Sequence, residues 1–265
     1  MIYEMSNSNL SFILKTLLDE RADYADIAIP YSQHEQRELM RSLLNVRPPL
    51  PVSDAFCVAQ DAELLEQRAE KGIVYCNETQ ISGIDNRLRL WQGDITRLEV
   101  DAIVNAANSS LLGCFVPLHR CIDNAIHSAA GVQLRLECHR LMQEQGSEEL
   151  TGSAKITKGY NLPVRYVIHT VGPIIQTPRP TPVQEQELAS CYRSCLEIAA
   201  ENRLESIAFC CISTGEFRFP QRLAAEIAVE TVRDYLNSNP SSLNTVVFNV
   251  FKDDDLMIYK ELLDV

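Results

Sequence analysis

Two cysteines and a histidine lie close together in the segment 113–121, as Cys114, His119 and Cys121. Thiolates and imidazoles are preferred zinc ligands, and a loop that also contains glycine and proline can bring all three side chains to one point. Three protein ligands leave the fourth position open, which is typical of catalytic rather than structural zinc. The spacing therefore predicts a zinc site. The alternative is two core cysteines beside a surface histidine.

Asp123 follows this segment at the start of a predicted helix. Its carboxylate has two interpretations: it stabilises the helix N-terminus, or it acts as a general base beside the metal. His127 lies one turn further along among apolar neighbours, and we expect it to be packed or hydrogen-bonded rather than to bind metal. We expect Cys138 to serve packing.

Three other short segments place polar groups where predicted strands end. Gly-Asp-Ile-Thr at 93–96 follows the first strand. Asn105 and Asn108 end the second, where two carboxamides can point into a cleft and bind sugar hydroxyls. Ser-Thr-Gly at 213–215 leads into a helix, so its backbone N–H groups can hold an anion. Each segment alone is also typical of an ordinary turn or loop.

Strand and helix patterns alternate through the second part of the chain. The pattern predicts strands at 87–92, 101–106, 153–158, 165–171, 206–211 and 244–250. It predicts helices at 121–130, 132–145, 183–202, 221–237 and 254–263. Such alternation indicates a three-layer α/β/α sandwich around a mixed, largely parallel sheet. Ligands bind outside the carboxyl ends of such strands, where the polar segments lie. In strand 206–211, the adjacent Cys210 and Cys211 face opposite ways, so we assign both to packing.

Residues 1–85 form a separate helical extension in this interpretation, and residues 86–265 form the α/β domain. Apolar residues recur at helical spacing over 8–20, and Ser32 and Ser53 have the character of helix N-caps. The extension contains no group of catalytic residues. We interpret it as a cap or a docking surface.

The chain has a net negative charge, which restricts the partners that it can bind. Lys and Arg number 24 against 36 Asp and Glu, a net charge of −12, which disfavours binding to a nucleic-acid backbone. No apolar run approaches the ~18 residues of a membrane helix, and the N-terminus has no basic signal region. An odd total of nine cysteines argues against a disulfide scaffold, so we expect a cytoplasmic protein.

Taken in order, the four segments resemble the macrodomain family, which consists of α/β/α modules that bind ADP-ribose at the strand ends. The resemblance covers residues 86–265 and rests on 93–96, 105–108, 123–131 and 213–215. Many macrodomains have a glycine run where this chain has 113–121. That change, with the helical extension, resembles the zinc-dependent branch found in microbes beside sirtuins that ADP-ribosylate proteins. A second departure, Glu216 to Phe219, leaves the diphosphate geometry open, and the Glu216 side chain is expected to point away from the phosphates.

The resemblance implies a role for each matching residue. Asp94 would accept a hydrogen bond from the adenine amino group, with the Ile95 N–H nearby, and Phe251 would stack on the adenine. Asn105 and Asn108 would face the distal ribose, and Asp123 and Asn108 would be catalytic. Zinc would lie beside that ribose on Cys114, His119 and Cys121. The diphosphate would bind backbone N–H groups of Ser213, Thr214, Gly215, Glu216 and Phe217.

The resemblance also implies an activity. We expect a zinc-dependent hydrolase that removes mono-ADP-ribose from modified protein side chains and so reverses ADP-ribosylation. Its partners would be ADP-ribose, a mono-ADP-ribosylated protein and an ADP-ribosylating sirtuin. One alternative is a module that binds ADP-ribose without hydrolysing it, for which a fourth protein ligand on the metal would be evidence. Another is a deacetylase acting on O-acetyl-ADP-ribose, which a substrate panel would separate.

Overall fold

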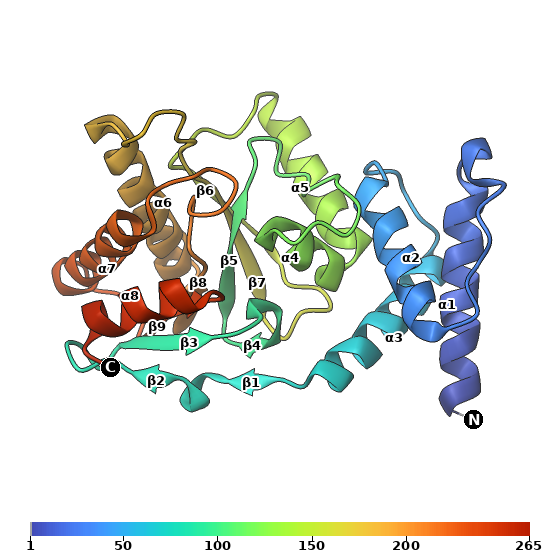
Figure 1. The fold of residues 1–265 in the computed structure, drawn as a ribbon, viewed down its shortest axis with the longest axis horizontal. Coiled ribbons are helices and arrows are strands. Elements are labelled where there is room, and N and C mark those ends of the chain that lie inside the picture. The colour runs from blue at the N-terminus through green and yellow to red at the C-terminus, as the bar shows by residue number, and fades with distance from the viewer. Residues whose placement is uncertain (1) are drawn as a thin grey trace.

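The computed structural model describes the backbone from residue 2 to residue 265 and the side chains from residue 9 (Figure 1). The chain begins with a helical unit of three helices, which are α1 (Ile2–Asp19), α2 (Gln33–Val46) and α3 (Asp54–Lys71). Ser32 and Ser53 cap α2 and α3 by accepting hydrogen bonds from backbone N–H groups of the first turn. The unit stands at one side of the molecule and has its own apolar core, which includes Leu14, Leu43 and Phe56.

A seven-stranded sheet forms the centre of the rest of the chain. Its strand order is β2-β3-β9-β8-β5-β7-β6, and the inner strands are parallel while β2 and β6 run antiparallel at the edges. A small parallel pair, β1-β4, lies beside it. The strands are β1 (Val74–Tyr75), β2 (Gln80–Ile81), β3 (Leu88–Gln92), β4 (Leu98–Glu99), β5 (Ala102–Ala107), β6 (Ala154–Lys158), β7 (Tyr166–Val171), β8 (Ser206–Phe209) and β9 (Thr245–Val250).

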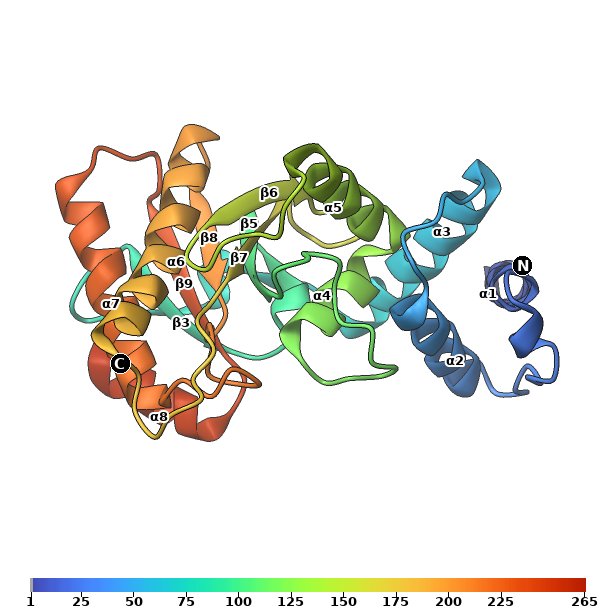
Figure 2. The same ribbon diagram turned by 90° about the horizontal axis from the view of Figure 1, so that it is seen from above.

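Helices cover both faces of the sheet, which confirms the predicted three-layer α/β/α architecture (Figure 2). One face carries α4 (Ile122–Ala130) and α5 (Val132–Gln145). The other carries α6 (Pro182–Glu201), α7 (Gln221–Ser238) and α8 (Asp253–Leu263). The helical unit packs against the α4–α5 side, where Val132 of α5 joins its apolar core. The order of layers is therefore helical unit, α4–α5, sheet and α6–α8.

One predicted strand is too long. The apolar run 206–211 predicts a strand of six residues, but β8 ends at Phe209. Cys210 and Cys211 consequently leave the regular strand, and both line the cleft described below. Strand alternation therefore does not describe the arrangement of these two residues.

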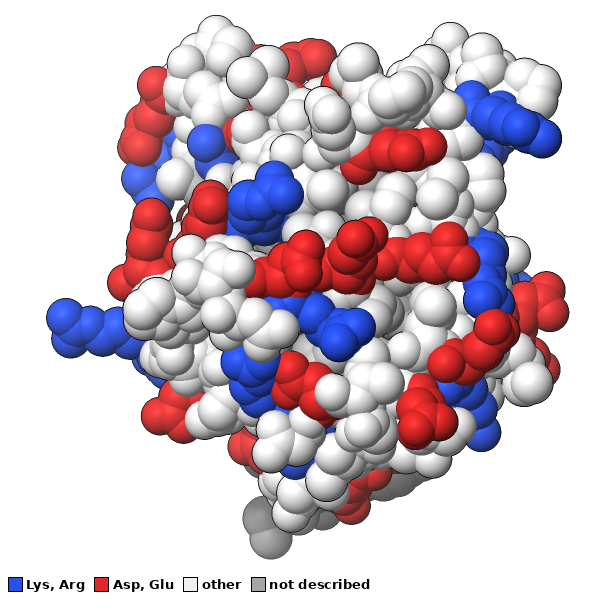
Figure 3. All heavy atoms as spheres, turned by 90° about the vertical axis from the view of Figure 1, so that its left-hand side faces the viewer, with Lys and Arg blue, Asp and Glu red and all other residues white. Residues whose placement is uncertain are grey.

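The outer face formed by α6–α8 carries charges of both signs. Figure 3 shows acidic and basic side chains interspersed there, with the acidic groups forming a short row. Arg222 of α7, for example, forms ion pairs with Glu226 on the same helix and with Glu261 on α8. Within the described residues, the structure has no helix that combines the length and the apolar character needed to span a membrane.

Candidate active site

A cleft of about 880 Å³ opens at the carboxyl ends of β3, β5, β8 and β9. This volume lies within the range typical of ligand sites in proteins. All but one of the residues to which the resemblance gave a role line it. They are Asp94, Ile95, Asn108, Cys114, His119, Cys121, Asp123, Ser213, Thr214, Gly215, Glu216, Phe217 and Phe251. The strand ends thus bring together segments that are far apart in the sequence.

Cys114, His119 and Cys121 form a compact cluster on one wall. Their sulfur and nitrogen atoms all lie within 4.8 Å of one another, and the Cys114 Sγ to His119 Nδ1 distance is 3.6 Å. Burial raises the pKa of the Cys121 thiol to about 12. Cys121 also precedes α4, where its sulfur accepts a hydrogen bond from the Asn124 N–H. The helix therefore fixes one end of the cluster.

Glu216 connects this cluster to the opposite wall. Its carboxylate lies 3.6 Å from His119 Nε2, while the side chain remains largely exposed. His119 consequently has a sulfur beside one ring nitrogen and a carboxylate beside the other. A carboxylate in this position orients an imidazole whose other nitrogen binds metal. Glu216 thus lies where it can act on the histidine, and its side chain is directed across the cleft mouth.

Asp123 is buried at the base of the cleft, in the first turn of α4. Burial raises the pKa of its carboxyl to about 6, although a hydrogen bond from Asn105 acts in the opposite direction. The helix N-terminus favours its ionised form. The position is therefore compatible with both interpretations of Asp123, as a helix-terminal residue and as a base.

Asn105 does not face the cleft, contrary to the role that the resemblance implied. Its side chain is fully buried, and Nδ2 lies 2.8 Å from Asp123 Oδ1 and 3.1 Å from His169 Nδ1. The reason is its place inside β5, level with His169 on β7 and under α4. Since the Asn105 amide donates to His169 Nδ1, the Nε2–H of His169 is the one that faces Thr157 Oγ1 at 2.9 Å. A buried chain of polar groups thus leads from β6 to Asp123.

Asn108 lies on the cleft wall, but its carboxamide also holds the loop that follows. Nδ2 donates to the Gly113 carbonyl oxygen at 3.0 Å, and Oδ1 accepts hydrogen bonds from the N–H and hydroxyl groups of Ser110. Gly113 has a φ of +84°, and a Cβ there would lie 2.9 Å from the His127 ring. Close packing against His127 therefore requires glycine at the start of the Cys-His-Cys loop.

The loop 213–217 provides unpaired donors. Among the described residues, none accepts a hydrogen bond from the backbone N–H groups of Thr214 to Phe217. Ser213 has a φ of +64°, and its buried hydroxyl has no hydrogen-bond partner within the described chain. Strained backbone and unpaired donors concentrate at ligand sites, where an anion can satisfy them. Gly172 allows this arrangement, because a Cβ there would lie 2.0 Å from Ser213 Oγ.

The far end of the cleft contains Asp94, Ile95 and Phe251. Asp94 Oδ1 accepts hydrogen bonds from the N–H and hydroxyl of Thr96, and Oδ2 lies 3.6 Å from Lys71 Nζ. Phe251 is 75% exposed, so its ring is available to a planar group. Asn249, which the sequence analysis missed, donates to the Gly93 carbonyl oxygen at 3.0 Å and holds the turn before Asp94.

Comparison with known proteins agrees with this arrangement. A family model described as Macro domain matches residues 104–228. A protein of Treponema medium named protein-ADP-ribose hydrolase is 51% identical over 257 residues, which cover 95% of this chain and 97% of that protein. The chain belongs to the Macro domain family.

Two further relatives indicate how far the similarity to this macrodomain protein extends. A Staphylococcus aureus protein, also named protein-ADP-ribose hydrolase, is 50% identical and covers 97% of this chain and 95% of its own length. A mutant of the Oceanobacillus iheyensis macrodomain, solved with ADPR, is 43% identical with a TM-score of 0.60. That match covers 91% of the solved chain but 67% of this one. The two hydrolases therefore match the helical unit as well, because their alignments leave out few residues of this chain.

The macrodomain cleft also contains a residue from the helical unit that sequence reasoning missed. Arg41 of α2 lines the cleft beside the Cys-His-Cys loop. Its helix is more than 70 residues away in the chain from the loop that it contacts. Helical periodicity alone does not identify such a contact, since it shows which face of α2 is apolar but not which element lies beyond it.

Proposed function

We propose that this macrodomain is a zinc-dependent hydrolase that releases mono-ADP-ribose from modified protein side chains. The observation that carries the proposal is the convergence of three features in one cleft. These are the unpaired donors of the loop 213–217, the carboxylate of Asp123 and the Cys114–His119–Cys121 cluster. The names of the full-length relatives support the hydrolase activity at the level of the family.

The cluster fits zinc by the chemistry of its donors. It offers two sulfurs and one imidazole nitrogen, close enough for one ion to bind all three. Within the described residues, only these three metal-binding side chains gather at this position, which would leave a coordination place for water or substrate. Bound there, zinc would lower the pKa of a water molecule or polarise an oxygen of the distal ribose.

The other residues of the cleft have separate roles in binding and catalysis. Backbone N–H groups of Thr214 to Phe217 bind the diphosphate, which explains how an acidic protein binds an anion. Asp94 and Phe251 bind the adenine end. Asp123 orients a water molecule toward the anomeric carbon of the distal ribose and accepts its proton. The bond from that carbon to the protein side chain breaks, and the side chain leaves with its electron pair and regains a proton.

The reaction requires an enzyme that first attaches ADP-ribose to a protein. We propose an ADP-ribosylating sirtuin as that partner and the cytoplasm as the location. The nine cysteines are all unpaired in the structure, which is the state expected in a reducing compartment.

A substrate panel tests the proposal. The protein is incubated separately with a mono-ADP-ribosylated protein and with O-acetyl-ADP-ribose, and free ADP-ribose is quantified by mass spectrometry. Release from the modified protein supports the hydrolase. Release from the acetyl ester alone would instead indicate a deacetylase. Tight binding of ADP-ribose in calorimetry without release from either substrate would indicate a binding module.

A further inference from the structure

The helical unit contacts the Cys-His-Cys loop directly through Arg41. Its Nη2 donates to the His119 carbonyl oxygen at 3.0 Å and to Asn124 Oδ1 at 2.7 Å. Asn124, buried in α4, in turn donates from Nδ2 to the Val116 carbonyl oxygen at 3.0 Å. Arg41 thus binds one carbonyl of the loop, that of His119. It also holds the Asn124 side chain, which binds a second loop carbonyl, that of Val116.

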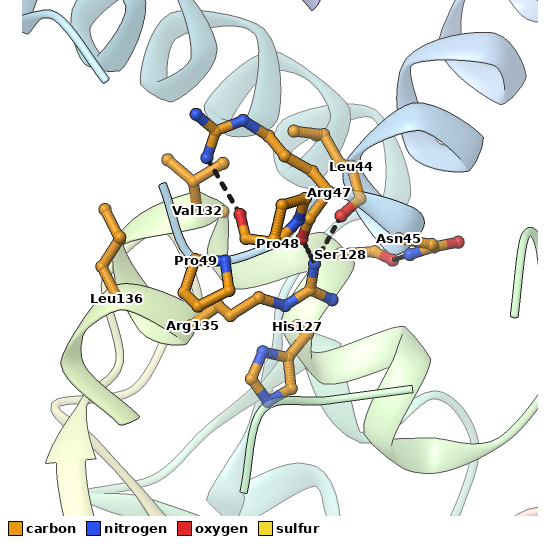
Figure 4. A pocket seen from close by; sticks show the side chains of 11 residues that line it. Leu44, Asn45, Arg47, Pro48, Pro49, His127, Ser128, Val132, Arg135 and Leu136 are labelled. Atoms are coloured by element: carbon orange, nitrogen blue, oxygen red, sulfur yellow. Dashed lines mark hydrogen bonds between the residues drawn. The ribbon is translucent and has the colours of Figure 1, made fainter. Parts of the chain in front are cut away.

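Asn45, one turn further along α2, makes a second contact. It is almost fully buried, and Oδ1 accepts a hydrogen bond of 3.0 Å from the Leu118 N–H. Its Nδ2 donates to Ser128 Oγ of α4, a bond visible in Figure 4. Leu118 has a φ of +54°, which is unfavourable for a side chain of this kind. Such a conformation persists only where the surroundings hold it, and the Asn45 amide does so here.

Arg135 of α5 joins the end of α2 to the same loop. Its guanidinium donates to the carbonyl oxygens of Leu44 and Arg47, as Figure 4 shows, and to that of Leu112. It also stacks 4.5 Å from the centre of the Phe115 ring. Carbonyls at a helix C-terminus carry partial negative charge, so they stabilise a buried cation. The C-terminus of α2 and the start of the loop therefore share one buried side chain.

We propose that the helical unit is a brace for the loop 113–121 and that Arg41 and Asn45 are positioning residues for the metal site. This inference rests on the proposed function for its metal. Arg41 and Asn45 join the unit to the loop by hydrogen bonds, so the brace is a role in addition to the predicted cap or docking surface. It also gives a reason why the two protein-ADP-ribose hydrolases match this chain over nearly its whole length.

The test compares Arg41→Ala and Asn45→Ala with Arg21→Ala in the full-length protein. Arg21 lies in the same helical unit, and its recorded side-chain contacts are with Asp23 and the Tyr24 ring. Arg21→Ala therefore removes a charge without touching the loop. Hydrogen exchange of segment 113–121 is measured without added metal. The loss of zinc to a chelator is then timed, and urea unfolding serves as a check of folding.

We expect faster exchange of segment 113–121 in Arg41→Ala and Asn45→Ala but not in Arg21→Ala. Zinc should be lost to the chelator roughly 10- to 100-fold faster in both loop-contact variants, in line with the usual effect on metal affinity of losing a group that orients a ligand. Affinity for ADP-ribose should change less than threefold in Asn45→Ala, because Asn45 does not line the cleft. Unchanged loop exchange in both variants, or an equal change in Arg21→Ala, would overturn the brace.

Faster loop exchange with wild-type zinc retention would overturn the positioning role at the metal. If the wild-type protein bound no zinc, the zinc assignment under the proposed function would fail along with that role. Hydrogen exchange would still decide whether the helical unit braces the loop.

Discussion

The amide of Asn105 donates a 2.8 Å hydrogen bond to the carboxylate of Asp123, inside the protein and behind the cleft wall. Asn105 therefore acts on the cleft through the acid that it holds. Its other contact, with His169, extends the network to the edge strand β6. The orientation of Asp123 is set by strands β5, β7 and β6 as well as by its own helix.

Replacing Asn105 with alanine should impair turnover more than binding. The change removes the donor that orients Asp123 and leaves buried acceptors unpaired, so the free energy of unfolding should fall by about 1–3 kcal/mol. We expect kcat to fall at least tenfold, with ADP-ribose affinity within threefold of wild type. Steady-state kinetics and urea unfolding measure both effects, and the exposed Asn202→Ala is the control. Wild-type kcat in Asn105→Ala would contradict this role.

Removing one side chain of the cluster should abolish turnover. Cys114→Ala and His119→Ala each take away one of the three proposed zinc ligands, whereas the donors proposed for the diphosphate lie on another loop. We therefore expect loss of ADP-ribose release, with affinity for free ADP-ribose within an order of magnitude of wild type. Cys57→Ala, on helix α3 and outside the cleft, is the control thiol. Wild-type turnover in either cluster variant would show that the zinc assignment is wrong.

Asp94→Ala should weaken binding of free ADP-ribose. The loss of a charged hydrogen-bond acceptor corresponds to about 1–3 kcal/mol of binding free energy. Asp94→Asn separates two roles, since an asparagine oxygen can still accept from Thr96 while the charge is gone. Calorimetry measures both variants. Unchanged affinity in Asp94→Ala would remove Asp94 from the binding site.

The buried His169 should make stability depend on pH. Burial lowers its pKa to about 3, whereas an unfolded histidine titrates near 6.5. The stability that it contributes is complete above pH 6.5 and is lost as the pH falls toward 3, because the unfolded chain takes up the proton first. Between pH 7.5 and 5.5 this loss is about 1.4 kcal/mol.

His169→Gln tests that contribution. Glutamine can still accept from Asn105 but does not titrate, so the variant should lose about 1.4 kcal/mol less than wild type over the same range. His127, whose ring centre lies 6.1 Å away, and Cys138 remain in both proteins, as does Asp123 beyond Asn105. Urea unfolding at the two pH values gives the difference. Parallel pH dependence in the two proteins would mean that His169 titrates normally.

The sequence was sufficient to predict the main elements, because their signals are local. Strand β5 and helix α4 follow from apolar periodicity, and the Ser32 and Ser53 caps follow from residue type. Two-residue strands such as β1 have no periodicity to detect. The end of β8 was missed because Cys210 and Cys211 continue the apolar run although the backbone leaves the sheet.

The sequence predicted most of the residues that line the cleft but few of the buried contacts behind them. Strand-end position identifies residues such as Asp94 and Ser213, since parallel strands end at one edge. The contact of Cys138 with His169 depends on packing between elements far apart in sequence, as does the contact of Arg41 with the Cys-His-Cys loop. Asn105 shows the limit most clearly. The residue type suited a ribose, but its register inside β5 directs the side chain into the protein.

The most direct test of the central claim measures release of ADP-ribose from a mono-ADP-ribosylated protein, with and without a strong zinc chelator. If the hydrolase depends on zinc, release stops with the chelator and returns when zinc is added. Release that is indifferent to the chelator would contradict that claim and leave a macrodomain hydrolase that needs no metal.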